Sequence, residues 1–180
     1  MMERDKRFGR RQGAPSQDEF EQAIIDIARV TRVMAGGKRM RFRACVLIGN
    51  RKGKVGMGVG KGLDVSLAVN KGVAQARKNI VSVPIYNETI PHQINCKFKA
   101  AHILLKPAPK GSGVIAGGAV RTVLALAGVS NVVAKILGSK NKINNVKVTL
   151  LAFKKLKRRP AKTVVINQPK DAATAAGATN

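Results

Sequence analysis

Residues 36–64 read GGKRMRFRACVLIGNRKGKVGMGVGKGLD, and this stretch decides the fold. Between positions 40 and 48 every even residue is apolar, whereas the odd positions begin with Arg39, Arg41 and Arg43. Strict alternation of this kind predicts a β-strand with one face on a core. The opposite face is cationic near the start of the strand.

A tight turn and a glycine-rich strand follow. Residues 49–53 (GNRKG) contain the glycine and asparagine that hairpin turns favour. The returning strand places glycine at positions 56, 58, 60 and 62. Glycine at this period indicates close approach by another backbone or by a ligand. Two interpretations stay open: a phosphate-bearing partner beside Lys54 and Lys61, or tight packing of a helix on the sheet.

Charge is the strongest compositional signal. The 180 residues include 34 Lys and Arg against 9 Asp and Glu, a formal net charge of +25. Between residues 27 and 170 the only acids are Asp64 and Glu88. Such a chain repels itself unless its partner is a polyanion, and nucleic acid rewards the charge through counterion release. A membrane surface is the alternative, but it requires an amphipathic basic helix as the main element.

No apolar run is long enough to span a membrane, and the polar N-terminus lacks a signal-peptide core. We therefore expect a cytoplasmic protein without a membrane anchor. The cysteines, Cys45 and Cys96, are isolated in predicted strands and are expected to be reduced core thiols.

The first half is predicted to form one domain at residues 21–84. A disordered basic arm at residues 1–20 precedes it, either solvated or ordered by RNA. A short helix is predicted at 18–26, a strand at 27–34, and then the two strands of the hairpin. Asp64 is predicted to be the N-cap of a following helix. The core-facing stripe of that helix is predicted to be Val65, Val69, Val73, Ala76 and Ile80.

The second half is predicted to form another domain at residues 85–157, followed by a basic, small-residue tail at 158–180 that we expect to be disordered. Strands are predicted at 90–98, 102–106 and 132–137. Helices are predicted from the loop at 109–119 to Ala127, with Gly128 as the C-terminal cap, and at 142–156. The order is strand, strand, helix, strand, helix, so the whole chain is predicted to be an α+β protein with two domains.

The loop at 109–119 reads PKGSGVIAGGA and leads into a helix. Backbone N–H groups at such a junction are suited to phosphate oxygens. Arg121 is predicted in the first helical turn, where it opposes the helix dipole, so an external anion would explain its presence.

Catalytic signatures are nearly lacking. The chain has no paired carboxylates, and its glycine runs fit neither the dinucleotide fingerprint nor the P-loop. His92, Cys96 and His102 match no zinc-site spacing. We therefore expect no catalytic residue, metal or cofactor. The loop at 109–119 does resemble the phosphate loop of galactokinase-like kinases, without its serine-rich core, so an enzyme of that class is the rival hypothesis.

Two long motifs occur in order over roughly residues 22–156. The first comprises Gly37-Lys38, Phe42-x-Ala44, Gly49-Asn50, Gly53-x-Val55-Gly56-x-Gly58-x-Gly60-Lys61 and Asp64-Val65. The second comprises Gly111-Ser112-Gly113-Val114-Ile115-Ala116-Gly117-Gly118-Ala119-x-Arg121, Ala127-Gly128-Val129-x-Asn131-Val132 and Gly138-Ser139-x-Asn141. Together they resemble the signature of the bacterial-type family of small-subunit ribosomal protein five.

The resemblance implies that the first domain, βββα, is similar to a double-stranded-RNA-binding module and that the second, ββαβα, is a two-layer sandwich shared with galactokinase-like kinases. It implies a structural, non-enzymatic constituent of the small ribosomal subunit. Such a protein binds ribosomal RNA, supports subunit assembly and contributes to translational accuracy near the messenger entry path. The implied partners are small-subunit ribosomal RNA, small-subunit proteins four and eight, and nearby messenger RNA.

The candidate RNA-binding residues combine the cations of the predicted strands and turns with the glycine-rich segments, because RNA is held mainly by phosphate and shape. They are Arg29, Arg32, Gly36, Gly37, Lys38, Arg39, Arg41, Arg43, Arg51, Lys52, Lys54, Gly56, Gly58, Gly60, Lys61, Lys110, Gly111, Ser112, Gly113, Gly117, Gly118, Arg121, Ser139, Lys140 and Asn141.

Overall fold

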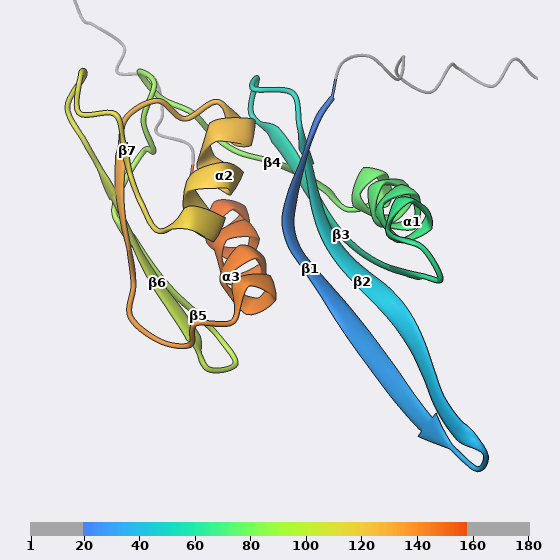
Figure 1. Ribbon diagram of the computed structural model, residues 1–180. Helices are drawn as coiled ribbons and strands as arrows, with labels where there is room; N and C mark the ends of the chain where they lie inside the picture. Colours follow the sequence, from blue (N-terminus) through green and yellow to red (C-terminus); the bar gives the residue numbers. More distant parts are fainter. Residues whose placement is uncertain (1–19, 158–180) are drawn as a thin grey trace, which may run out of the picture.

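The computed structural model describes residues 20–157, which form two four-stranded sheets and three helices (Figure 1). The first sheet is antiparallel, in the order β1 (Glu21–Met34), β2 (Gly37–Gly49), β3 (Lys54–Gly62) and β4 (Ile80–Ser82), and α1 (Val65–Lys78) connects β3 to β4. The second sheet has the order β5 (Ile94–Phe98), β6 (Ala101–Pro107), β8 (Val132–Ile136) and β7 (Val114–Ile115), with β7 and β8 parallel. Helices α2 (Gly118–Ala127) and α3 (Lys142–Lys155) belong to this second half.

The predicted α+β class with two domains is confirmed, although β4 and β7 were not predicted because each has only two or three residues. The predicted helix at 18–26 is wrong. β1 begins at Glu21 and pairs with β2 along its whole length, with a bulge between Ile24 and Asp26. The isoleucines there favour a strand, and β2 offers a partner for it. The predicted strand at 90–98 begins only at Ile94.

The predicted arm and tail lie outside the described residues, except Phe20. No helix within residues 20–157 is long and apolar enough to cross a membrane.

Helix α1 packs on the glycine face of β3 at backbone distance. A Cβ added to Gly58 would lie 1.9 Å from the carbonyl oxygen of Gly72, and one added to Gly60 would lie 2.0 Å from that of Ala68. Gly56, Gly58 and Gly60 are buried. Tight helix packing is therefore the correct interpretation of the glycine run. A phosphate-bearing partner at this face is wrong, because α1 occupies it.

The predicted stripe of α1 is correct in part: Val73 and Ala76 are buried, and Val69 packs against the same core. Ala68 and Gly72 are buried as well, whereas Val65 is exposed and Ile80 lies beyond the helix, in β4. Where the helix backbone comes closest to β3, at Ala68, Gly72 and Ala76, only small side chains fit.

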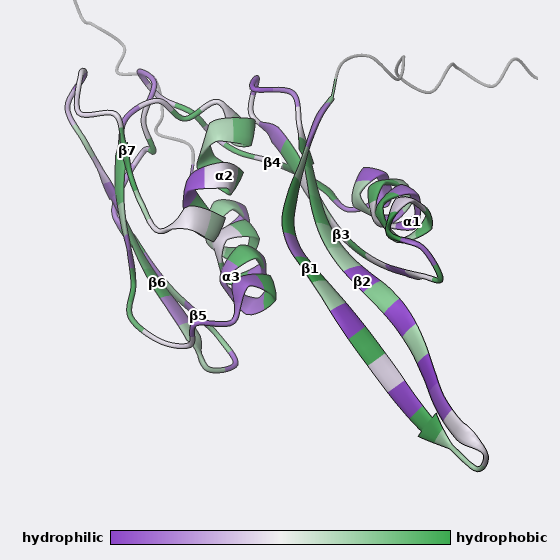
Figure 2. Ribbon diagram, in the orientation of Figure 1, coloured by the Kyte–Doolittle hydropathy of each residue, from purple (hydrophilic) through white to green (hydrophobic). Residues whose placement is uncertain are grey.

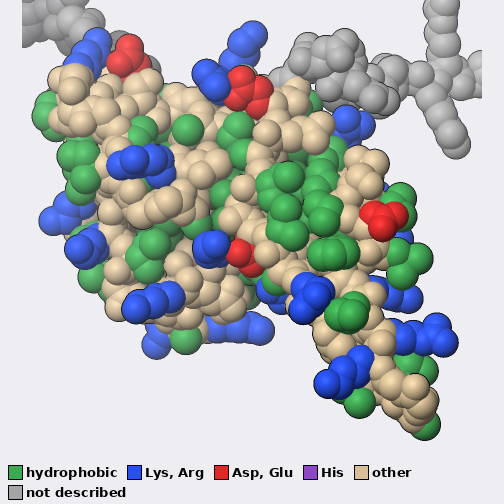
Figure 3. All heavy atoms as spheres, viewed as in Figure 1, with side chains coloured by type: hydrophobic (Ala, Val, Ile, Leu, Met, Phe, Trp, Pro, Cys, Tyr) green, Lys and Arg blue, Asp and Glu red, His purple; other side chains and the backbone are tan. Residues whose placement is uncertain are grey.

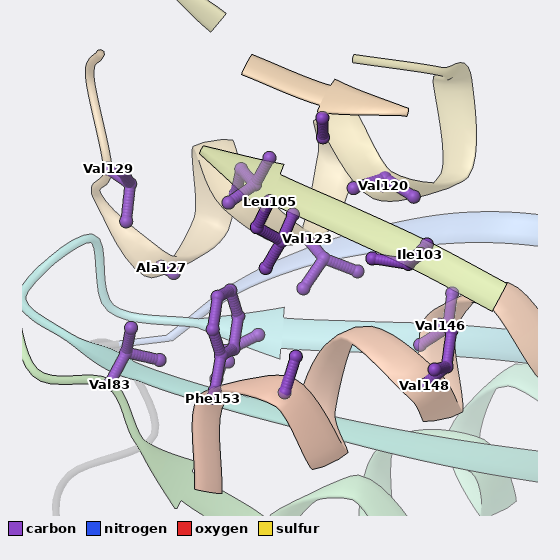
Figure 4. Close-up of a cluster of buried hydrophobic side chains, with 14 of the residues drawn as sticks. Val83, Ile103, Leu105, Val120, Val123, Ala127, Val129, Val146, Val148 and Phe153 are labelled. Atoms are coloured by element: carbon purple, nitrogen blue, oxygen red, sulfur yellow. The ribbon is translucent and has the colours of Figure 1, made fainter. Parts of the chain in front are cut away.

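The opposite face of the first sheet is buried as well. Cys45, Leu47 and Met57 belong to the same core as the apolar residues of α2, α3 and the second sheet. Figure 4 shows Phe153 of α3 in this core, pointing toward Ala127 of α2. The molecule therefore has four layers: α1, the first sheet, the α2–α3 pair and the second sheet (Figure 1).

We predict that Gly58→Ala lowers the free energy of unfolding by about 3 kcal/mol, because its methyl group would overlap the Gly72 carbonyl and push α1 off the sheet. The control is Gly118→Ala in the first turn of α2, where a Cβ meets nothing within 4 Å. That change should be neutral or stabilise by up to about 1 kcal/mol. Urea unfolding of both variants checks this, and equal effects would contradict the packing described above.

Candidate nucleic-acid interface

β1 and β2 extend beyond the rest of the first sheet as a two-stranded ribbon (Figure 1). β3 pairs with β2 only as far as Phe42, so residues 30–34 and 37–41 pair only with each other. Residues 30–41, including the turn at Ala35-Gly36, are named the distal ribbon. Figure 2 shows hydrophilic and hydrophobic residues alternating along the ribbon strands, as the sequence predicted.

One face of the distal ribbon carries uncompensated arginines. Arg32 lies directly opposite Arg39 in the ladder, and Arg41 follows on the same face opposite Val30. Like charges directly opposite each other destabilise a sheet. The ion pairs found among residues 20–157 use other cations, so no described carboxylate compensates these three arginines.

Lys61 of β3 joins the same group. With Arg32, Arg39 and Arg41 it lines a hollow of about 400 Å³, whose other lining residues are Val30, Thr31 and Met34. Figure 3 shows Lys and Arg side chains around the projecting ribbon and no Asp or Glu on its visible face. The hollow therefore combines four cations with the apolar side chains of Val30 and Met34, which suits an anion that also has apolar parts.

The other face of the ribbon strands carries Lys38 opposite Val33 and Arg29 opposite Phe42. Val33 is 71% exposed and Met40 is 55% exposed. Gly36, in the turn, has φ +86° and open space around its Cα, so the turn is free to approach a partner closely. The ribbon is thus exposed on both faces, with cations on each.

Asp26 connects the base of the ribbon to the second half of the chain. Its Oδ1 accepts a hydrogen bond from Lys142 Nζ at 3.0 Å, and its Oδ2 lies 3.9 Å from Arg43 Nη2. Lys142 begins α3, where the helix dipole disfavours a cation, so Asp26 offsets that charge. Arg43 is therefore a partly compensated candidate, unlike Arg39 and Arg41.

Cys45 lies opposite Asp26 in the ladder. Burial raises the pKa of the Cys45 thiol to about 11, and the Asp26 carboxylate adds to the rise. The thiol therefore stays protonated at neutral pH and is not a nucleophile.

The turn between β2 and β3 is docked against α2. The N–H of Arg51 donates to the Leu126 carbonyl at 3.0 Å, and the N–H of Gly53 donates to the Ala127 carbonyl at 2.9 Å. The last four carbonyls of a helix need partners beyond the helical ladder. In α2 the Leu124 carbonyl accepts from the N–H of Val129, and the Ala125 carbonyl accepts from the N–H of Gly128. All four terminal carbonyls of α2 are therefore satisfied.

Gly128 is the predicted C-terminal cap, with φ +84°. The side chains of Arg51, Lys52 and Lys54 remain exposed around the docked turn, and Arg51 pairs with Glu21 at 2.8 Å. These three candidate RNA-binding residues therefore belong to a turn whose backbone is hydrogen-bonded to α2.

The side chain of Asn131 forms hydrogen bonds with the backbone of the glycine-rich loop before α2. The Asn131 Oδ1 accepts from the N–H of Gly111 at 3.1 Å and from that of Gly113 at 3.2 Å. The N–H of Ser112 donates to the Pro109 carbonyl at 3.3 Å. Phosphate binding by these three backbone N–H groups is therefore wrong, since all three are used internally.

Phosphate binding stays a prediction for the start of α2. Gly117, Gly118 and Arg121 are exposed there, as is Lys110 on the loop, and the first turn of α2 contains no acid. Sequence reasoning gave Asn131 no role, because its partners lie 18 and 20 residues away. The only available signal was its place in the second motif.

The last candidate segment, Ser139-Lys140-Asn141, caps α3. Asn141 Oδ1 accepts from the N–H of Ile143 at 3.0 Å and of Asn144 at 3.4 Å, and Ser139 Oγ accepts from the N–H of Asn141 at 3.1 Å. In the structure Asn141 is thus the N-cap of α3, and Ser139 supports it by accepting its backbone N–H. Lys140 is exposed.

We predict that Arg39→Thr slows hydrogen exchange of the distal-ribbon amides by up to about fivefold, because it removes the like-charge pair with Arg32. Arg29→Thr is the matched control, since Arg29 lies opposite Phe42 and relieves no such pair. Exchange that is equally fast in both variants would contradict a charge conflict in the ribbon.

Comparison with known proteins identifies the family. Residues 20–84 match the N-terminal domain of ribosomal protein S5, and residues 96–162 match its C-terminal domain. The chain is 51% identical over 142 residues to small ribosomal subunit protein uS5 of Synechococcus elongatus, covering 78% of this chain and 79% of that protein.

The chain is 49% identical over 142 residues to uS5 of Campylobacter jejuni, and the match covers 79% of this chain and 97% of that protein. It is 48% identical over 143 residues to uS5c of Spinacia oleracea, a longer protein of which 46% is covered. The resemblance carried by the two motifs is therefore confirmed, and the chain belongs to the ribosomal protein S5 family.

Proposed function

We propose that this chain, as a structural protein of the small ribosomal subunit, binds ribosomal RNA through the distal ribbon. The observation that carries the proposal is the cluster of Arg32, Arg39, Arg41 and Lys61, which the described residues leave without a carboxylate partner. An RNA backbone supplies the missing negative charge, and release of its counterions favours binding.

The shape of the ribbon favours folded RNA over single strands. Two antiparallel strands make a narrow projection that reaches between RNA helices, where phosphates of more than one strand surround it. The chain has one Tyr, five Phe and no Trp, and Phe42 is half-buried at the ribbon base. Recognition by base stacking is therefore a minor component, and phosphate and shape dominate.

A second contact surface is proposed at Lys110, Arg121 and the exposed start of α2. Family resemblance adds the finer parts of the proposal: support of subunit assembly, proximity to messenger RNA, and a contribution to translational accuracy. Small-subunit proteins four and eight are the proposed protein partners. Ile115 and Leu137, which are 55% and 53% exposed on the second half, offer apolar surface for such contacts.

The rival hypothesis, an enzyme of the galactokinase-like class, loses its main support. The loop N–H groups that would hold a nucleotide phosphate are bonded to Asn131 and Pro109. Three of the four carboxylates in residues 20–157 are also engaged: Glu21 with Arg51, Asp26 with Lys142, and Glu88 with Asn131.

We predict that Arg32→Gln/Arg39→Gln/Arg41→Gln weakens binding to a transcript of small-subunit ribosomal RNA. For this triple variant, the slope of log affinity against log salt concentration should be smaller in magnitude by about two to three, because up to three phosphate contacts are lost. The control, Lys71→Gln/Arg77→Gln/Lys78→Gln on the exposed face of α1, removes the same charge. Equal slopes for the two triple variants would show that only net charge matters and would refute the ribbon as the site.

A further inference from the structure

Glu88 occupies a strained position. Tyr86 and Thr89 exchange backbone hydrogen bonds of 2.9 and 3.0 Å around the two-residue turn Asn87-Glu88. Asn87 has φ +48° and Glu88 has φ +65°. Turns with both central residues left-handed favour Asn-Gly, so a glutamate at the second position costs conformational energy that glycine would avoid. It is also one of only two acids between residues 27 and 170.

The interactions of Glu88 converge on Asn131. Its carbonyl accepts from the N–H of Ser130 at 3.0 Å and of Asn131 at 3.1 Å, and its Oε2 accepts from Asn131 Nδ2 at 3.3 Å. Asn131 is 4% exposed, and its Oδ1 accepts hydrogen bonds from the N–H groups of Gly111 and Gly113. Glu88, Asn131 and the glycine-rich loop therefore form one hydrogen-bonded chain.

Two backbone hydrogen bonds also restrain the loop: the Gly113 carbonyl accepts from the N–H of Val132 at 3.1 Å, and the N–H of Ser112 donates to the Pro109 carbonyl at 3.3 Å. Gly111 and Gly113 have φ +90° and +68°, and a Cβ on either would meet nothing within 4 Å. The side on which a Cβ would lie is therefore open at both glycines, and glycine has many accessible conformations, so the hydrogen bonds to Asn131 limit its freedom. Asn131 Oδ1 accepts two N–H groups much as an anion oxygen would, and Glu88 orients the amide so that its oxygen faces the loop.

We propose that Glu88 and Asn131 are positioning residues that fix the glycine-rich loop before RNA binds, so that Lys110 and the start of α2 are presented in one geometry. This inference rests on the proposed function. A loop that is ordered in advance avoids the entropy cost of being ordered on binding.

Two variants of the full-length chain test whether the bond between Glu88 and Asn131 fixes the loop: one adds a negative charge at position 131, and the other moves the negative charge from position 88 to position 131. Asn131→Asp places a second carboxylate against Glu88. In Glu88→Gln/Asn131→Asp the polarity of the bond is reversed, because the new amide at position 88 donates to the new carboxylate at position 131, which still accepts from both glycines. The double variant keeps the wild-type net charge. Asn95→Asp, on the exposed side of β5, adds the same charge as Asn131→Asp without touching the loop.

The readouts are hydrogen exchange of the Gly111 and Gly113 amides and affinity for a transcript of small-subunit ribosomal RNA. Asn131→Asp should raise both the exchange rates and the Kd by roughly three- to tenfold, as expected for the loss of about one hydrogen bond. The double variant should return both to within about twofold of wild type. Thermal unfolding of each variant separates loosening of the loop from loss of the fold.

Failure of the double variant to rescue either readout, or an Asn131→Asp chain that matches Asn95→Asp in both, would overturn the inference while leaving the proposed function intact. A wild-type chain that does not bind the transcript would overturn the proposed function and the inference together.

Discussion

Residues 44–49 of β2 and 55–58 of β3 are buried, with neighbours on both faces of the sheet, and this constraint determines how everything else is placed. The glycine face of the β2–β3 hairpin brings the α1 backbone within contact distance of the sheet. Its other face shares a core with α2, α3 and the second sheet, and its turn completes the C-terminal cap of α2. The two halves are therefore joined through backbone groups as well as side chains, and the distal ribbon projects from a base that cannot rotate independently.

The fold tolerates its charge without neutralising it. Opposed like charges on a sheet cost only about 0.2–1 kcal/mol per pair, which is small beside the free energy of burying a core that spans both halves. The few described acids are placed at structural positions: Asp26 against Lys142, and Glu88 against Asn131. Arg32, Arg39 and Arg41 of the ribbon have no such partner among the described residues, so under the proposed function stability and RNA binding would use different residues.

The elements of the fold were largely readable from local sequence. Alternation from 40 to 48, the Gly49–Gly53 turn chemistry and the Gly128 cap predicted what the structure shows. Asp64 does precede α1, but its side chain makes no capping hydrogen bond, and the backbone carbonyl accepts from Ala68 instead. The short helix predicted at 18–26 was wrong because the isoleucines there favour a strand and the next strand, β2, is long enough to pair with all of β1.

The site was harder to predict, because it depends on contacts between distant residues. Periodicity showed that glycines 56–62 must admit a close neighbour, but it could not decide between α1 and RNA. The Asn131 bonds to Gly111 and Gly113 change the expected role of that loop, and no local pattern contains them. The paired placement of Arg32 and Arg39, by contrast, follows directly from hairpin register once the two-residue turn is known.

The central claim is that the distal ribbon is embedded in ribosomal RNA. Photo-crosslinking in cells tests it most directly, with a photoreactive residue placed either at Met40 in the ribbon or at Leu67 on α1, which are 55% and 46% exposed. The account predicts crosslinks from position 40 to small-subunit ribosomal RNA and far fewer from position 67. RNA crosslinks of equal yield from both positions, or none from position 40 in a chain that sediments with ribosomes, would contradict it.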